Sequence, residues 1–176
     1  MPNINKSVKF VSINIALLTI SDSRSENEDE SGKLLNDRII NFGHFVKKRL
    51  IIKDDFEVIK QTFLDLSNDP LIDVIISTGG TGLTGRDITP EALDEIADKH
   101  IPGFGEVFRY YSLETVGTSS IQSRACAVLA NGKYIFALPG SSGGVTDAWD
   151  KILIHQLDIN HKPCNFVELF SRLKEK

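Results

Sequence analysis

Two glycine-rich segments and several aspartates carry the residue types that could do chemistry in this 176-residue chain. The first segment reads Ser-Thr-Gly-Gly-Thr-Gly over 77–82, and the second reads Pro-Gly-Ser-Ser-Gly-Gly over 139–144. Glycine lets backbone N–H groups converge on a phosphate, and carboxylates hold Mg²⁺ together with phosphate oxygens. This combination favours phosphoryl or nucleotidyl transfer by positioning and electrostatic stabilisation. The alternative for either segment is a tight turn without a ligand.

The first segment matches neither common nucleotide-binding loop, because no Lys-Ser or Lys-Thr follows it and GxGxxG is absent. Asp87 lies between this segment and a predicted helix start, so a functional role is favoured there. In that helix start we predict Thr89 as the N-cap, Pro90 at the first helical position and Glu91 in the first turn. The position of Asp87 therefore indicates an anion site.

Two other aspartates follow predicted strands, and their positions are less decisive. Asp54 is evenly balanced between a functional role and helix capping, because it forms an Asp-Asp pair directly before a helical pattern. For Asp22, in the polar turn at 21–24, a structural role is at least as well supported. The acidic segment at 25–30 is more typical of a solvated loop than of a site.

The elements that must position these residues follow from hydrophobic periodicity. Apolar runs predict strands at 13–20, 45–52, 74–76, 125–130 and 134–138, with Asn131-Gly132 as a hairpin turn between the last two. Helical spacing is found over 33–42, 56–66, 106–113 and around Trp149. This alternation predicts a three-layer α/β/α fold with a mostly parallel central sheet plus a small β-hairpin. Such sheets bind ligands beyond the carboxyl ends of their strands.

Composition excludes several classes of protein. The formal net charge of −4 and the lack of a basic stripe argue against a nucleic-acid partner, and no apolar run is long enough to span a bilayer. Only Cys126 and Cys164 occur, without metal-ligand spacing, which favours reduced core thiols in a cytoplasmic protein. Residues 1–12 read as a flexible tail.

Four segments resemble the MogA/MoaB family of molybdenum cofactor biosynthesis proteins. They are GGTGLTGRDITPEAL at 79–93, IPGFGEVFR at 101–109, TSSIQSRA at 118–125 and ALPGS at 137–141, together with the early turn SDSR. The closing QLDINHKPCNF is more similar to the MoaB branch than to the MogA branch. The resemblance runs from residue 13 to residue 166, which implies a single molybdopterin-binding domain of MogA-like fold and a C-terminal tail at 167–176.

The resemblance also implies an activity and partners. The expected function is molybdopterin adenylyltransferase, a nucleotidyltransferase that uses Mg²⁺ and ATP, in a homotrimer or homohexamer that works with other cofactor-biosynthesis proteins. The residues Ser142-Gly143-Gly144 depart from the family, which usually has a proline- or lysine-containing turn there. This departure leaves open a non-catalytic molybdopterin-binding or carrier protein of the same pathway. A general nucleotide-binding sensor is a third hypothesis.

Carried over residue by residue, the family's two functional aspartates fall on Asp54 and Asp87, which are expected to be catalytic and to hold Mg²⁺. Ser123 and Arg124 match a motif near the pterin. With the residues that follow the predicted strands, the full set of expected substrate- and nucleotide-binding residues is Ser21, Asp22, Gly79, Gly80, Thr81, Gly82, Thr89, Glu91, Ser123, Arg124, Pro139, Gly140 and Ser141.

Overall fold

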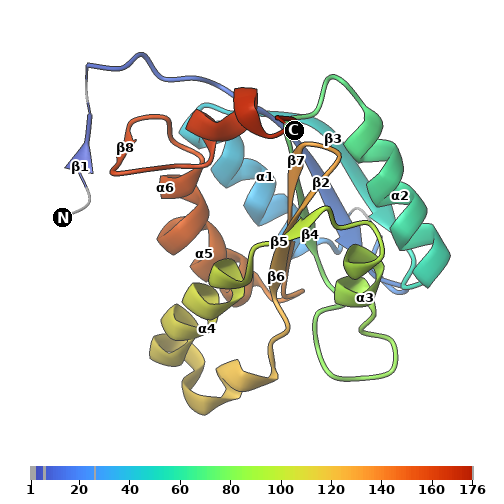
Figure 1. The fold of residues 1–176 in the computed structure, drawn as a ribbon. Helices are drawn as coiled ribbons and strands as arrows, with labels where there is room; N and C mark the ends of the chain where they lie inside the picture. The colour runs from blue at the N-terminus through green and yellow to red at the C-terminus, as the bar shows by residue number, and fades with distance from the viewer. Residues whose placement is uncertain (1–2, 6, 26, 176) are drawn as a thin grey trace.

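Six strands form one mixed sheet at the centre of the protein, and helices cover both of its faces (Figure 1). The structure is a computed structural model that describes residues 3–5, 7–25 and 27–175. Residues 1, 2, 6, 26 and 176, which fall in the two predicted tails and the acidic loop, lie outside the described residues. In spatial order the strands are β3 (Phe45–Ile52), β2 (Asn14–Ile20), β4 (Val74–Thr78), β7 (Lys133–Leu138), β6 (Cys126–Ala130) and β5 (Lys99–His100).

The sheet is mostly parallel, as predicted. Strands β3, β2, β4 and β7 run in the same direction, and β6 is antiparallel to both of its neighbours, β7 and β5. The hairpin between β6 and β7 turns at Asn131 and Gly132, both of which have positive φ. The Asn-Gly prediction is therefore confirmed, because a two-residue hairpin of this kind requires left-handed backbone at both positions. The hairpin belongs to the central sheet.

Two hydrophobic cores lie on opposite faces of the sheet, which makes the fold three-layered. Successive side chains of a strand point to opposite faces, so Leu17 of β2 faces one core and Leu18 faces the other. The first core is covered by α1 (Glu30–Phe42), α4 (Pro102–Val116) and the continuous helix formed by α5 (Ser142–Ala148), the π-helical turn η2 (Trp149–Leu153) and α6 (Ile154–Gln156). The second core is covered by α2 (Phe56–Asn68) and α3 (Thr89–Asp94).

The beginning of α1 differs from its prediction. The helix starts at Glu30 rather than at residue 33, because the Asp29 carboxylate accepts a hydrogen bond from the Gly32 backbone N–H and caps the first turn. Asp29 is also fully buried, where it accepts hydrogen bonds from the Thr19 hydroxyl at 2.9 Å and from the Arg49 guanidinium at 2.8 Å. The end of the acidic segment is thus structural and buried, and the prediction of a solvated loop is wrong for this residue.

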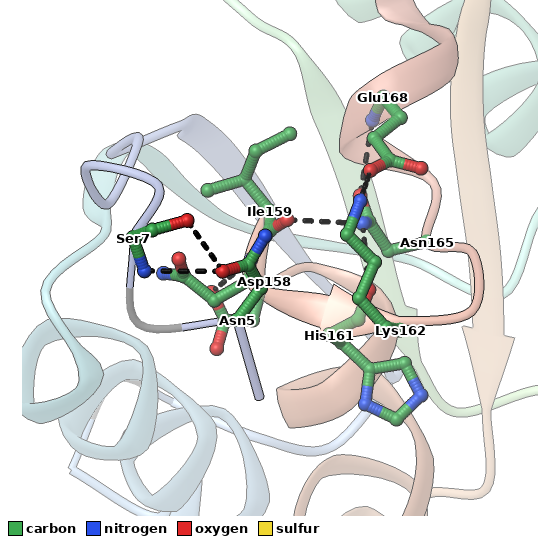
Figure 2. Close-up of polar contacts among 9 residues, drawn as sticks. Asn5, Ser7, Asp158, Ile159, His161, Lys162, Asn165 and Glu168 are labelled. Carbon is green, nitrogen blue, oxygen red and sulfur yellow. Dashed lines mark hydrogen bonds and ion pairs between the residues drawn. The ribbon is translucent and has the colours of Figure 1, made fainter. Parts of the chain in front are cut away.

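The N-terminal end of the chain pairs with a segment that follows α6. Strand β1 (Asn3–Ile4) pairs with β8 (His161–Lys162) in a separate two-stranded ribbon. Figure 2 shows how Asn165 holds the loop before the C-terminal 3₁₀-helix η3 (Val167–Arg172): its amide donates to the carbonyls of residues 159 and 161 and accepts from the Glu168 backbone N–H. The buried side chain of Val167 contacts the first core, although the domain boundary at residue 166 remains a prediction.

The structure also shows the environments of the two cysteines and of Trp149. Both cysteines are free, but Cys164 is exposed and Cys126 is only partly buried, so the expectation of core thiols is wrong for Cys164. Trp149, in the last segment of predicted helical spacing, is buried in the first core. Among the helices of the described ranges, none is both long enough and apolar enough to cross a membrane.

Candidate functional site

Three turns that leave neighbouring parallel strands form the floor of the candidate site. Ser21 follows β2, Gly79 follows β4 and Pro139 follows β7, and these strands are adjacent in the sheet. The turns pack main chain against main chain: a Cβ atom on Gly79 would lie 2.2 Å from the carbonyl oxygen of Ile20, and one on Gly140 would lie 3.4 Å from the Gly79 Cα. Only glycine allows this approach at residue 79, where φ is +108°.

A cavity of about 480 Å³, here called the glycine cavity, opens above this floor. The structure brings most of the expected binding residues to its wall, namely Ser21, Gly79, Gly80, Thr81, Gly82, Asp87, Ser123, Pro139, Gly140 and Ser141. The volume is typical of a site for a small organic ligand or nucleotide. The remaining expected residues, which are Asp22, Asp54, Thr89, Glu91 and Arg124, are not among those that line this cavity.

Asp87 closes the end of the first glycine loop. Its carboxylate accepts hydrogen bonds from the Thr84 backbone N–H at 2.8 Å and from the Thr84 hydroxyl at 2.7 Å. Partial burial acts to raise the pKa of Asp87. The two hydrogen bonds from Thr84, a third from the Gly82 backbone and the positive charge of Arg124 outweigh this effect and hold the pKa below its usual value. Asp87 is therefore ionised at neutral pH.

Asp54 has the opposite electrostatic environment. Desolvation, followed by the negative charge of Asp22, raises the pKa of Asp54 above its usual value, and Asp87 adds to the shift. The Asp54 backbone N–H donates to the Asp22 carboxylate at 3.1 Å, so the turns after β2 and β3 are linked. The Asp54 carboxylate also approaches the loop, because its Oδ1 lies 3.4 Å from where a Cβ atom on Gly80 would be.

The negative charges of Asp22 and Asp87 thus act on Asp54 beside the glycine loop, and a bound cation would offset their repulsion. Mg²⁺ is usually held by one or two carboxylates plus substrate phosphates and waters, and Asp54 and Asp87 fit that pattern. A complete protein cage is not formed, since the described residues contain no group of three or more histidine, cysteine, aspartate or glutamate side chains with metal-binding geometry. The donor set suits a metal that arrives with a phosphate ligand.

Arg124 fixes the far side of the glycine loop. Its guanidinium donates to the Gly82 carbonyl at 2.7 Å, to the Asp87 carbonyl and to the Glu91 carboxylate. Its backbone N–H also donates to the Thr81 carbonyl at 2.9 Å. Arg124 and Glu91 therefore shape the loop, and Arg124 does not line the glycine cavity.

Thr89 has a different role from the N-cap that its sequence position predicts. The N-cap of α3 is Ile88, Thr89 is the first helical residue, and no side chain caps this helix. The Thr89 hydroxyl donates instead to the Gly79 carbonyl at 3.1 Å, and its backbone N–H donates to the Gly80 carbonyl at 3.1 Å. The prediction was wrong because the first glycine loop folds back onto the start of α3, where its carbonyl groups accept both hydrogen bonds that Thr89 donates.

Arg24, which was not among the expected site residues, lines the glycine cavity. Its guanidinium donates to the Ser31 hydroxyl at 2.8 Å and to the Gly140 carbonyl at 2.9 Å, so it joins the start of α1 to the second glycine turn. Within the part of the chain that the structure describes, it is the one lysine or arginine on the wall of this cavity. The sequence signal that could have identified Arg24 is its position in the polar turn after the first predicted strand.

Comparisons with known proteins show the family to which this sequence is similar. Residues 16–159 match the family described as "probable molybdopterin binding domain". The chain is 44% identical over 161 residues to molybdenum cofactor biosynthesis protein B of Escherichia coli K12, which covers 91% of this chain and 94% of that protein.

Solved structures show the same likeness. A crystal structure of a molybdenum cofactor biosynthesis protein B covers 94% of this chain and 98% of its own, with a TM-score of 0.85 and 38% identity. A second, described as the molybdopterin biosynthesis enzyme MoaB of Thermus thermophilus, covers 80% of this chain and 89% of its own, with a TM-score of 0.72 and 29% identity.

Proposed function

The chain belongs to the MogA/MoaB family of molybdenum cofactor biosynthesis proteins, within its MoaB type, and from this premise we propose that it is a molybdopterin adenylyltransferase. The observation that carries the proposal is the glycine cavity, where two glycine turns, the Asp87 carboxylate and the Arg24 guanidinium converge at adjacent strand ends, with the Asp54 carboxylate close to Gly80. One relative of 29% identity is described as a molybdopterin biosynthesis enzyme, which supports an enzymatic role.

The proposed reaction joins molybdopterin to AMP. An oxygen of the terminal phosphate of molybdopterin attacks the α-phosphorus of ATP, the bond from that phosphorus to the β-phosphate oxygen breaks, and pyrophosphate leaves. The backbone of Gly80, Thr81 and Gly82 surrounds the phosphates, and Arg24 supplies positive charge from the side of the second turn. Mg²⁺ held by Asp54 and Asp87 would neutralise charge on the phosphate groups.

Asp54 and Asp87 have different roles in the proposed reaction. Asp87 is held ionised by Thr84 and Arg124 and so keeps a fixed negative charge at the loop. Asp54 has a raised pKa because it is desolvated and faces Asp22. A bound cation would lower that pKa again, because its positive charge offsets the repulsion that Asp22 and Asp87 exert on Asp54.

The test is adenylylation of molybdopterin by the purified protein with Mg²⁺ and ATP, with the product separated by chromatography. We expect AMP transfer by the wild type and its loss in Asp87→Ala. The matched control is Asp37→Ala, an exposed aspartate on α1 outside the glycine cavity, which should keep full activity. Absence of product from the folded wild type would refute the enzyme.

A non-catalytic molybdopterin carrier is the second candidate, because the turn at Ser142-Gly143-Gly144 lacks the lysine or proline that the resemblance leads one to expect. Arg24 counts against it, since its guanidinium contacts the carbonyl of Gly140 and so provides a cation at this same turn. A carrier would bind molybdopterin without consuming ATP. Release of pyrophosphate during single-turnover reactions would exclude it.

We also propose that the chain forms a homotrimer or homohexamer and that this assembly binds other cofactor-biosynthesis proteins. The support is the outer side of α4, where Val107, Tyr110 and Leu113 are between 43% and 67% exposed although Phe104 and Phe108 of the same helix are buried. Light scattering should give a mass three or six times that of the chain. A monomeric mass would refute this part of the proposal.

A further inference from the structure

The guanidinium of Arg24 is held on the wall of the glycine cavity by two uncharged groups. It donates to the Ser31 hydroxyl at 2.8 Å and to the Gly140 carbonyl at 2.9 Å. Within the described ranges, no carboxylate forms an ion pair with it. A guanidinium has five N–H donors, so these two bonds orient Arg24 without neutralising its charge and leave three donors for a ligand.

Ser31 offers Arg24 an acceptor in a fixed position. The residue is 2% exposed and lies in the first turn of α1, directly after Glu30. An arginine side chain has many rotamers and loses about 2 kcal/mol of conformational entropy when it is ordered. Because Ser31 already restrains the side chain in the unliganded protein, less of this cost falls on ligand binding.

A buried carboxylate fixes the start of the helix that carries Ser31. Asp29 is 1% exposed, and it accepts hydrogen bonds from the Gly32 backbone N–H at 2.9 Å and from the Arg49 guanidinium at 2.8 Å. The packing is close, since a Cβ atom on Gly32 would lie 2.1 Å from Oδ2 of Asp29. Burial acts to raise the pKa of Asp29, but the hydrogen bonds that it accepts, above all the one from Arg49, hold that pKa below its usual value. Asp29 is therefore a charged and compensated anchor for the first turn.

Arg24 joins the starts of two helices. Helices α1 and α5 contact each other and lie side by side in Figure 1. The Gly140 carbonyl belongs to the second glycine turn, which leads into α5 at Ser142, and the Ser31 hydroxyl belongs to the start of α1. The direction of the Arg24 guanidinium is thus determined by both helix starts at once.

We propose that Ser31 is a positioning residue for Arg24, and that it aims the remaining N–H groups of the guanidinium at a substrate phosphate in the glycine cavity. This role rests on the proposed function, which places phosphates in that cavity. The hydroxyl suits the task because it is neutral: a carboxylate in its place would pair with the positive charge that Arg24 offers to a phosphate.

A double-mutant cycle tests whether Ser31 acts through Arg24. Calorimetric titration with ATP and Mg²⁺, without molybdopterin, is run on the wild type, Ser31→Ala, Arg24→Met and the double variant. We expect Ser31→Ala to weaken ATP binding roughly 3- to 10-fold, and Arg24→Met roughly 10- to 100-fold. The double variant should bind ATP within about 2-fold of Arg24→Met, because no guanidinium is left to position. Losses that add in the double variant would overturn the role of Ser31.

Ser67→Ala is the matched control for the loss of a buried serine hydroxyl. Ser67 is 1% exposed in α2, its hydroxyl donates to the Leu64 carbonyl at 2.9 Å, and it does not line the glycine cavity. Ser67→Ala and Ser31→Ala should lower the unfolding temperature by similar amounts, since each removes one buried hydrogen bond. Only Ser31→Ala should weaken ATP binding. Equal losses of ATP affinity in the two variants would show a general structural effect and overturn the proposal.

The outcomes distinguish the role of Ser31 from the enzymatic function. If the wild type adenylylates molybdopterin but Ser31→Ala binds ATP as tightly as the wild type, the positioning role is overturned and the enzyme stands. If the cycle is non-additive but no product forms, the positioning role is supported and the adenylyltransferase is not. If the folded wild type does not bind ATP, both are overturned.

Discussion

Replacing Gly82 by alanine should displace the Asp87 carboxylate without changing its chemistry. The added Cβ would lie 2.7 Å from Oδ2 of Asp87, whereas ordinary van der Waals contact begins at 3.4 Å, so the carboxylate must move by about 0.7 Å. A misplacement of about 1 Å in an active site can cost roughly 100-fold in rate. We therefore expect kcat/KM for adenylylation to fall roughly 30- to 100-fold, which is about 2–3 kcal/mol of transition-state stabilisation.

Gly85→Ala is the matched control, because Gly85 lies in the same loop and a Cβ there would meet nothing within 4 Å. Both variants are assayed by chromatography of the adenylylated pterin at saturating ATP, and their unfolding temperatures are compared with that of the wild type. We expect the control to stay within about 2-fold of the wild type, as is usual for open surface positions. A fully active Gly82→Ala variant, or two variants with equal losses, would refute a role for the position of Asp87.

Three further predictions follow from the same geometry. Arg24→Met removes charge-assisted contacts beside the phosphates and should weaken ATP binding roughly 10- to 100-fold in calorimetric titrations; unchanged affinity would contradict it. Gly79→Ala should lower the free energy of unfolding by roughly 3 kcal/mol or more in urea titrations, because φ is +108° and the Cβ would lie 2.2 Å from the Ile20 carbonyl; an unshifted midpoint would count against this packing. Burial lowers the pKa of His44 to about 4 from 6.5 in the unfolded chain. Its neutral form therefore contributes stability above pH 6.5 that is lost as the pH falls towards 4, amounting to about 3 kcal/mol, and His44→Asn should flatten that dependence in urea titrations at each pH.

The sequence predicted the features of the site that depend on local pattern. The carboxyl ends of the three neighbouring strands could be predicted from apolar runs that end in glycine or polar turns. Strands and turns can be predicted in this way because both depend on residues that are close together in the sequence. Gly79–Gly82 and Pro139–Gly140 were identified in this way, and the structure brings them to one cavity. Residues whose neighbours in the chain determine their conformation could thus be assigned from the sequence.

The remaining features depend on contacts between distant residues. Arg24 was missed because its partner Gly140 is 116 positions away, and Asp29 was misjudged because Arg49 of β3 neutralises it inside the fold. Thr89 was predicted to cap its own helix, yet the loop ten residues earlier offered the acceptor. In each case a local rule was overruled by a tertiary partner that only the folded sheet brings close.

The close main-chain packing of the three turns has a consequence for how new specificities can arise in this fold. A side chain at residue 79 would collide with the carbonyl oxygen of Ile20, and a Cβ atom on Gly140 would contact the Cα of the same glycine, so the neighbouring turns cannot absorb a substitution at residue 79. Adaptation to another substrate is therefore expected at exposed side chains on the cavity wall, such as Ser23 and Gln122. The main-chain packing of the floor thus fixes the positions of the three turns, whereas exposed wall residues can change with the ligand.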